Sequence, residues 1–321
     1  MKKNVYLLIG LPGCGKSTWS ARKLKYSVFP NPSTAVISSD AIRGELYGDE
    51  NIQGDPNVVF DTVKQRLADA VCGYYDNIIL DATNLKKKDR IRTIQDLERR
   101  VRNSSKATRD IEYEVIAVWF AVPVDECQRR NSERKRVVPK EVIDRMYKNF
   151  SPPGYEEGFD KIQIVFSDYD EGQYSVERFL EVADVFDQHN PHHTHTLGLH
   201  CRKTQEYVDA HGGDETLSFA ALIHDNGKLK TATYVNGKGE TTDVQHFYQH
   251  HCVGAYDAAF YCKTKGFNER GIVRVANLIY YHQHPMMQWK SEKAKKKDVE
   301  RMPTKFYAEL MLLHEGDRCA H

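Results

Sequence analysis

The sequence GLPGCGKST, residues 10–18, decides the fold expected for the first half of the chain. It fits the pattern G-x-x-x-x-G-K-[ST] and follows a short apolar run at residues 4–9. In this pattern glycines let backbone N–H groups close around phosphate oxygens, the lysine reaches the β- and γ-phosphates, and the hydroxyl binds magnesium. We therefore predict that ATP and Mg²⁺ bind here, with Lys16 catalytic and Ser17 a metal ligand. The predicted nucleotide loop is Gly10, Leu11, Pro12, Gly13, Cys14, Gly15, Lys16, Ser17 and Thr18.

Strand and helix patterns alternate on both sides of this loop. β-branched runs predict strands, and the longer segments between them have helical spacing. Such alternation favours right-handed crossovers and a mainly parallel sheet, so we expect an α/β domain built around this P-loop, which alone does not distinguish a kinase from an ATPase. The predicted strands are residues 4–10, 33–39, 77–82, 113–120 and 161–166, and the clearest predicted helices are 56–71 and 86–101.

A second candidate site lies in the sequence ISSDAIR, residues 37–43. Asp40 falls at the carboxyl end of the second predicted strand, where sheets of this kind bind ligands. Arg43 follows one helical turn later, so both side chains can face one acceptor. Asp40 could accept the proton of an attacking hydroxyl while Arg43 holds an anionic group. Taken alone, Asp40 fits a helix N-cap equally well.

A basic segment at residues 124–150 is predicted to form a helix, a break at 137–139, and a second helix. A mobile basic lid can stabilise a phosphoryl group during transfer. An ordinary solvated helix face is the alternative. The basic residues of the first helix and its end are Arg129, Arg130, Arg134, Lys135 and Arg136.

Residues 1 to 166 resemble the kinase domain of the bacteriophage 5′-polynucleotide kinase family, through GLPGCGKSTW, SSDAIR, LDATNL and RRNSERKRVVPKEVIDRMYK. The resemblance implies that Lys16 and Ser17 bind ATP and magnesium. It implies that Asp40 is the general base on a 5′-hydroxyl. It places the acceptor strand against Arg43 and Thr83. It assigns Arg134 to the transition-state charge and ATP, and Arg130 to a supporting role beside it.

The composition changes near residue 190, because all 14 histidines lie from His189 to His321. Helical patterns dominate beyond this point, with a small hairpin predicted at residues 233–241. We therefore predict three parts: a kinase domain at residues 1–168, a connecting segment at 169–188, and an all-α domain at 189–321.

The second half resembles HD-type metal phosphohydrolases, and especially the HD domains of some tRNA nucleotidyltransferases. The resemblance rests on HTLGLHCRKTQEYV, ALIHDNGK, HFYQHHCVGAY, LIYYHQHP and LHEGDRCAH. It implies that Lys228 holds a substrate phosphate. Imidazole and carboxylate together suit transition metals such as Mn²⁺, Ni²⁺ or Co²⁺, which lower the pKa of water. The implied ligands are His200, His224, Asp225 and Asp317 for one metal, and His250 and His282 for a second.

Several neighbouring residues receive weaker predictions. His251 and His284 are expected to be non-ligand neighbours of the metal site. His192, His193 and His195 are expected either on the substrate side or simply as polar residues. Polynucleotide kinases often continue into a phosphatase with a D-x-D-G-T motif, but a glutamate separates Asp168 and Asp170 from Gly172. These two aspartates are predicted to be linker carboxylates.

Together these patterns predict a bifunctional enzyme that heals nucleic-acid ends. It would phosphorylate 5′-OH ends with an NTP donor and remove 3′-phosphate or 2′,3′-cyclic phosphate ends. RNA is favoured over DNA as the partner, and an RNA ligase could act with it. One alternative is a nucleoside or nucleotide kinase fused to a nucleotide phosphohydrolase. Another is an NTP-gated HD metal nuclease.

Bulk composition limits the other function classes. A net charge of +1 excludes general binding of nucleic acid through overall charge, so any such surface must be local. The first apolar run is too short for a signal peptide, and no segment reaches membrane-spanning length. The seven cysteines are scattered, which favours reduced thiols in a cytoplasm, including the host cytoplasm of a phage.

Overall fold

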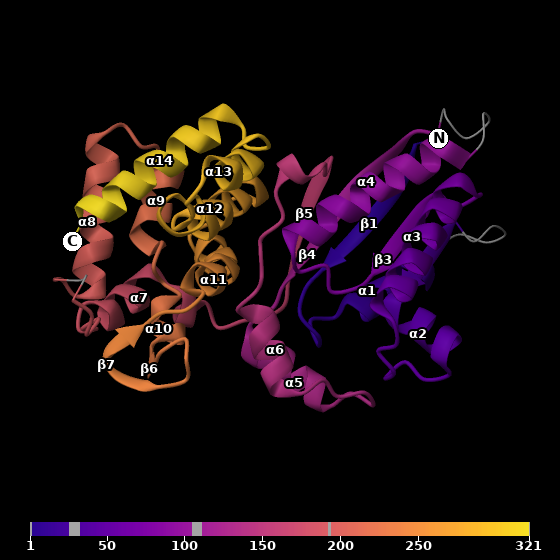
Figure 1. Ribbon diagram of the computed structural model, residues 1–321, viewed down its shortest axis with the longest axis horizontal. Helices are drawn as coiled ribbons and strands as arrows, with labels where there is room; N and C mark the ends of the chain where they lie inside the picture. Colours follow the sequence, from indigo (N-terminus) through magenta and orange to yellow (C-terminus); the bar gives the residue numbers. More distant parts are fainter. Residues whose placement is uncertain (1, 26–32, 105–110, 192–193, 321) are drawn as a thin grey trace. The chain divides into compact units, whose positions relative to one another are not determined.

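The computed structural model describes residues 2–25, 33–104, 111–191 and 194–320 and contains two compact units (Figure 1). Unit 1 comprises Met1–Asp144 and Glu157–Asp168, and unit 2 comprises Arg145–Glu156 and Tyr169–His321. The boundaries of these units differ from the predicted domain boundaries. The predicted domain boundaries stay a prediction. The segment 145–156 packs within unit 2, because the Phe150 ring lies 4.9 Å from that of Tyr256 and Asn277 Nδ2 donates to Pro153 O over 3.0 Å.

Unit 1 contains a five-stranded sheet in the order β2-β3-β1-β4-β5, and every neighbouring pair is parallel. This confirms the predicted α/β class and the five predicted strands. The central strand β1 is almost entirely buried, as continuous apolar runs in parallel sheets require. The strands are β1 (Lys3–Ile9), β2 (Thr34–Ser38), β3 (Asn77–Asp81), β4 (Tyr113–Ala121) and β5 (Lys161–Phe166).

The helices of unit 1 begin where local sequence can satisfy their free N–H groups. Ser38 caps α2 by accepting from Ala41 N, and Asp55 caps α3, which has a proline in its first turn. The break between α5 and α6 spans residues 133–139 and is longer than predicted. The helices are α1 (Lys16–Lys25), α2 (Ser39–Tyr47), α3 (Pro56–Cys72), α4 (Lys87–Ser104), α5 (Val124–Ser132), α6 (Lys140–Tyr147, which continues into unit 2) and the 3₁₀ turn η2 (Tyr155–Glu157, of which only Glu157 belongs to unit 1).

A fully buried ion pair connects α4 with the last residue of η2 in unit 1. Arg90 on α4 binds both carboxylate oxygens of Glu157, over 2.8 and 2.6 Å. The same guanidinium donates to Asn84 O and Leu85 O over 3.0 and 3.1 Å. Arg90 therefore fixes the loop that follows β3, which contains Thr83.

Unit 2 is helical, as predicted, with one antiparallel hairpin near the expected position. Thr196, Asp214 and Asn268 cap α8, α9 and α12 with their side chains. The hairpin is β6 (Thr233–Val235) and β7 (Thr241–His246). The helices are η3 (Glu171–Tyr174), α7 (Val176–Ala183), α8 (Leu197–Ala210), α9 (Glu215–Ile223), α10 (Lys228–Thr231), α11 (His250–Thr264), α12 (Glu269–Tyr281), η4 (His284–Gln288), α13 (Glu292–Val299) and α14 (Thr304–Cys319).

Two general features complete the description. Among the described residues, none of the helices combines the length and apolar character that crossing a membrane requires. All seven cysteines are free thiols, and five of them are buried.

Candidate active sites

The loop at residues 10–15 has the backbone that a phosphate cradle needs. Gly13 and Gly15 have φ values of 84° and 99°, which side chains other than glycine rarely adopt. A Cβ at Gly13 would also come within 2.2 Å of Cys127 O. Lys16 is buried, and its Nζ donates to Gly10 O and Leu11 O over 2.8 and 2.9 Å. Lys16 thus holds the start of the loop in place, while Ser17 in the first turn of α1 is exposed.

Asp81 is a site residue that the sequence analysis did not single out. It ends β3, the strand next to β1, so its carboxylate lies beside the phosphate loop. Burial raises its pKa, while the Lys16 charge and a hydrogen bond with Ser17 act in the opposite direction. A serine hydroxyl with a strand-end carboxylate is the oxygen set that holds Mg²⁺ in P-loop enzymes. Asp81 and Ser17 therefore fit a nucleotide-bound magnesium ion.

Asp40 is held between two arginines. Its Oδ1 lies 2.8 Å from Arg43 Nη1 and its Oδ2 lies 2.9 Å from Arg136 Nη1. The N-cap of α2 is Ser38, so Asp40 is not the helix cap that its position also allowed. The side chain is 43% exposed, and an acceptor can reach it. Arg43 is adjacent as expected, and the pairing with Arg136 was not predicted.

The basic segment contains both paired and free charge. Arg129 and Arg130 are bound by Glu126, and these arginines lower the pKa of Glu126 to about 2. Arg134 is exposed beyond the end of α5, and its charge acts on the Asp81 carboxyl. Thr83 contacts the phosphate loop through its backbone, where its carbonyl accepts from Gly10 N over 3.1 Å. The roles predicted for Arg130, Arg134 and Thr83 stay predictions.

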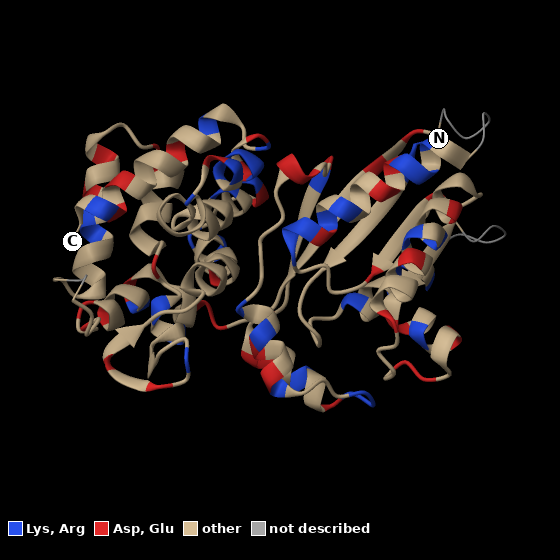
Figure 2. Ribbon diagram, viewed as in Figure 1, with Lys and Arg blue, Asp and Glu red and all other residues tan. Residues whose placement is uncertain are grey.

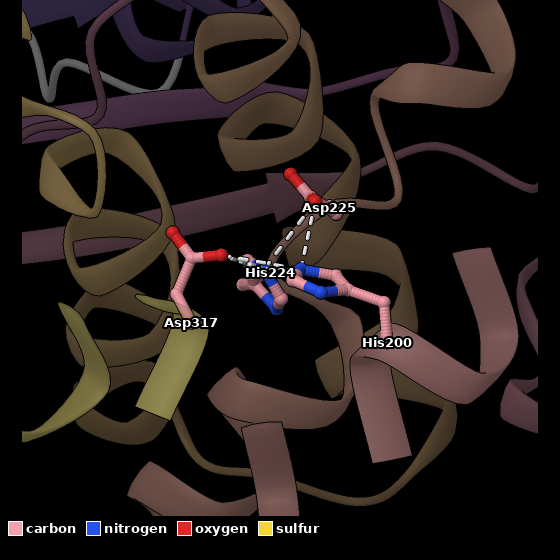
Figure 3. Close-up of side chains that lie close together, drawn as sticks. All are labelled: His200, His224, Asp225 and Asp317. Atoms are coloured by element: carbon pink, nitrogen blue, oxygen red, sulfur yellow. Dashed lines mark hydrogen bonds and ion pairs between the residues drawn. The ribbon is translucent and has the colours of Figure 1, made fainter. Parts of the chain in front are cut away.

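The structure brings the six predicted ligands of unit 2 into two adjoining groups, and Figure 3 shows the four residues of the first group. His200 Nε2, from α8, lies 3.2 Å from His224 Nε2, just after α9. Asp317 Oδ1, in the last turn of α14, lies 3.1 Å from His200 Nε2 and 3.5 Å from His224 Nε2. Asp225 Oδ2 lies 3.4 Å from both nitrogens. These four groups could hold one metal ion.

The other oxygen of Asp225 belongs to a second group. Asp225 Oδ1 lies 3.0 Å from His250 Nε2 and 3.5 Å from His282 Nε2, and the two nitrogens are 3.3 Å apart. His224, just after α9, thus belongs to the first group alone, whereas the next residue, Asp225, lies between the two groups. All six predicted ligands are present in the two clusters, and Asp225 belongs to both.

The hydrogen bonds of the imidazoles support a metal at each group. The Nδ1 atoms of His224, His250 and His282 lie 2.6–2.8 Å from the backbone carbonyls of Ala221, Phe247 and Ile279. An Nδ1–H donor of this kind leaves the Nε2 lone pair free, which is the usual arrangement of a metal-bound histidine. Two facing Nε2 lone pairs 3.2 or 3.3 Å apart repel each other, and a metal ion between them removes that repulsion. Asp225 Oδ1 is buried and has no hydrogen-bond partner among the described residues.

The charged groups of this centre shift one another's pKa values. Burial opposes a charged His224, but the adjacent Asp225 and Asp317 carboxylates raise its pKa to about 10. Burial acts against ionised Asp225 too, but the Lys228 charge and the neighbouring histidines hold its pKa well below the usual range. Lys228 Nζ lies 2.7 Å from Asp225 Oδ2 and donates to Gln188 Oε1 over 2.8 Å. Lys228 therefore contacts a ligand directly, and its predicted contact with a substrate phosphate stays a prediction.

The remaining candidates lie outside both clusters. The Nδ1 atom of His284 faces Asp298, and the half-buried His251 lies beside His250 and Tyr280. His195 Nε2 lies 2.7 Å from Lys203 Nζ, whereas His192 and His193 lie outside the described residues. Asp168 is exposed, and Asp170 caps η3, so neither is placed with other ligand groups in the described parts of the chain.

Two protein families match separate parts of this chain. Residues 5–153 match the AAA domain family, and residues 192–310 match the HD domain family. The chain therefore combines an N-terminal P-loop kinase-type domain with a C-terminal HD domain. This confirms the predicted pair of domain types, and HD domains as a class bind divalent metals.

Individual relatives show more distant similarity. L-seryl-tRNA(Sec) kinase of Methanococcus maripaludis is 25% identical over 190 residues, which are 57% of this chain and 66% of that protein. A chain of the Pnkp1/Rnl/Hen1 RNA repair complex is 16% identical, with a TM-score of 0.35 over 45% of this chain and 43% of its own. A fungal RNA kinase is 15% identical, with a TM-score of 0.39 over 53% of this chain and 76% of its own. This chain thus spans less than two thirds of the curated relative and under half of the repair-complex chain.

Proposed function

We propose that this protein heals broken nucleic-acid ends, with RNA as the preferred substrate. Unit 1 would phosphorylate 5′-OH ends with ATP or another NTP, and unit 2 would remove 3′-phosphate or 2′,3′-cyclic phosphate ends. The observation that carries this proposal is that a phosphate-binding type of loop and a cluster of potential metal ligands occupy separate compact units and share no residue. The two reactions are compatible because they act on opposite sides of one break, and a ligase could use the product.

The kinase reaction follows from three groups in unit 1. Lys16 and the loop amides bind the nucleotide phosphates, and Mg²⁺, held by Ser17 and Asp81, would supply charge neutralisation there. Asp40 accepts the proton of the attacking hydroxyl. Arg43 and Arg136, which both contact Asp40, orient that carboxylate and hold the acceptor next to it. Exposed Arg134 can approach the transferred group.

The hydrolase reaction follows from the centre in unit 2. His200, His224, Asp225 and Asp317 would hold one transition metal, with His250, His282 and the other Asp225 oxygen holding a second. Such metals supply a water-derived nucleophile at neutral pH and polarise a phosphoryl oxygen. Lys228 keeps Asp225 ionised and oriented. The burial of the ligands limits their movement, which preorganises the centre.

A second acceptor for the kinase is favoured by one comparison. The similarity to L-seryl-tRNA(Sec) kinase suggests a hydroxyl other than an RNA 5′ end. A free nucleoside, the small-molecule acceptor of the alternative considered from the sequence, is a separate candidate. Competition separates these alternatives, because a 5′-OH oligonucleotide should suppress nucleoside phosphorylation strongly if strand ends are the true acceptors. An NTP-gated nuclease would instead transfer phosphate only to water, and Asp40 would be dispensable.

The proposal is tested with one substrate. An RNA oligomer with a 5′-OH and a 3′-phosphate is incubated with the protein, ATP and divalent metals, and both ends are analysed. We expect a product with a 5′-phosphate and a 3′-OH. Transfer of phosphate only to water, or an unchanged 3′ end with every metal tried, would overturn the corresponding half of the proposal. The predicted cytoplasmic location is untested by this assay.

A further inference from the structure

Helix α13 and its flanks carry a local excess of positive charge. Residues 290–301 contain six basic and three acidic side chains, a local net charge of +3, whereas the whole chain has a net charge of only +1. None of the residues of α13 is buried. Lys290, Lys293 and Lys297 form no ion pair within the described part of the chain. Figure 2 shows this charge as blue on α13. The basic residues are Lys290, Lys293, Lys295, Lys296, Lys297 and Arg301.

This basic helix is attached to the segment that follows a metal-ligand candidate. His282 is followed directly by η4, whose first residue His284 has its Nδ1 3.2 Å from Asp298 Oδ2 on α13. Trp289 Nε1 donates to the same oxygen over 3.0 Å. Asp298 faces η4, and helical geometry turns Lys293 about 140° and Lys297 about 100° away from it, where both are exposed. Helix α13 is therefore attached to the segment that begins two residues after His282.

Aromatic and apolar groups accompany the charge. The rings of Trp289 and Tyr307 stack, with centroids 6.1 Å apart and an interplanar angle of 25°. Lys295 Nζ lies 5.8 Å from the centre of the Tyr307 ring. Met286 and Met287 on η4 are 57% and 49% exposed. A basic track next to exposed apolar and aromatic groups is the composition with which proteins bind single-stranded nucleic acid.

We propose that α13 and the segment 284–289 bind the RNA strand that leads to the 3′ end in the metal centre. This inference rests on the function proposed above and deepens it. The lysines would contact backbone phosphates of upstream nucleotides, and the aromatic and methionine side chains would contact bases. The hydrolase unit would thus select strand ends over mononucleotides, because a mononucleotide has no upstream phosphates for α13 to bind.

The test compares two variants of the full-length protein with equal loss of charge. Lys293→Gln/Lys297→Gln changes the proposed surface. Lys265→Gln/Arg270→Gln changes two exposed residues at the junction of α11 and α12, at the other end of α12 from His282. Two readouts are used: anisotropy of a labelled ten-nucleotide RNA, and release of phosphate from a 3′-phosphorylated RNA and from a nucleoside 3′-monophosphate.

We expect the surface variant to bind RNA more weakly, with a smaller dependence on salt. Each lost phosphate contact lowers the salt slope of single-strand binding by about 0.7, so the surface variant should lose about 1.4. RNA affinity should fall about tenfold at physiological salt, and KM for the RNA should rise about tenfold with kcat unchanged. The nucleoside 3′-monophosphate should be hydrolysed at the normal rate, and the control variant should behave like the unmodified protein.

Two results would overturn this inference. One is equal RNA affinity and equal salt slope for the surface and control variants. The other is displacement of RNA by a glutamate-rich peptide as efficiently as by unlabelled RNA, which would point to an acidic protein partner. Failure of the proposed function looks different: the unmodified protein would release phosphate from neither substrate, while the anisotropy comparison would still decide whether α13 binds RNA.

Discussion

The two candidate sites differ in how their side chains are held. In unit 1, Ser17 and Arg134 are exposed, and the Asp40 side chain is 43% exposed. In unit 2, Asp225 and the four histidine ligands are each at most 3% exposed. A site that receives a charged nucleotide and releases it needs access and movable cations. A site that retains metal ions needs rigid, desolvated ligands, because those ions offset the cost of burying charge. The difference indicates a transient ligand in unit 1 and resident ions in unit 2.

The largest expected effect tests whether the two sites are independent. Lys16→Ala should reduce 5′ phosphate transfer by at least about three orders of magnitude and leave 3′-phosphate release unchanged, because the cation that holds the transferred phosphate is lost. Asp225→Ala should do the reverse, because it removes the residue shared by both metal groups. Both activities are measured on the same RNA, with circular dichroism as the control for folding. Loss of both activities in either folded variant would contradict separate sites.

The next prediction concerns the proton acceptor. Asp40→Asn keeps the shape of the side chain, so ATP binding should stay nearly intact, while 5′ phosphorylation falls by about two orders of magnitude or more. Calorimetric titration with ATP and single-turnover kinetics measure the two quantities. Asp49→Asn on the exposed turn after α2 is the matched control and should behave normally. Full kinase activity of the Asp40 variant would remove this residue from the mechanism.

A third prediction concerns the stability of unit 1. If it failed, the contrast between the two units in how they hold their side chains would be weaker. Unit 1 also contains a buried charge pair, Arg90–Glu157. Glu157→Gln leaves Arg90 buried without its counter-charge, which should lower the free energy of unfolding of unit 1 by about 3 kcal/mol or more. Denaturant unfolding followed by Trp119, which is buried on β4, measures this. Glu45→Gln, which removes the partner of Arg66 in an exposed ion pair, should change little.

The smallest effect concerns Asp81. If Asp81 and Ser17 hold the nucleotide-bound magnesium, Asp81→Asn should raise the Mg²⁺ concentration for half-maximal kinase activity about tenfold, since one of the ion's charged ligands becomes neutral. A Mg²⁺ titration at fixed ATP gives this value. Asp76→Asn, just before β3, serves as the control. An unchanged Mg²⁺ requirement would place the ion elsewhere.

The sequence predicts much of this structure because the relevant signals are local. Short β-branched runs identified all five strands of unit 1, and the resemblance to HD-type phosphohydrolases implied the six residues that converge in unit 2. The role of Asp81 was missed because it depends on strand order: only once β3 is known to lie beside β1 does its last residue meet Ser17.

Other features were not predictable for a similar reason. The pairing of Arg136 with Asp40 joins residues that are 96 positions apart in the sequence, and no periodicity reports such a contact. The contact of Lys228 with Asp225 and Gln188 also arises from packing. Likewise, the packing of residues 145–156 within unit 2 depends on aromatic contacts of Tyr147 and Phe150 with Tyr256, which lies more than a hundred residues later.

The central claim is that one chain holds two phosphate-transfer sites with different metal chemistry, and metal exchange tests it most directly. Ser17 and Asp81 offer hard oxygen ligands that suit Mg²⁺, whereas the imidazoles of unit 2 favour Mn²⁺, Co²⁺ or Ni²⁺. Protein stripped with a chelator and returned to Mg²⁺ alone should recover 5′-kinase activity but little 3′ processing. A transition metal should then restore 3′ processing, and His224→Ala should block that rescue. Full 3′-phosphate release with Mg²⁺ alone would contradict the account.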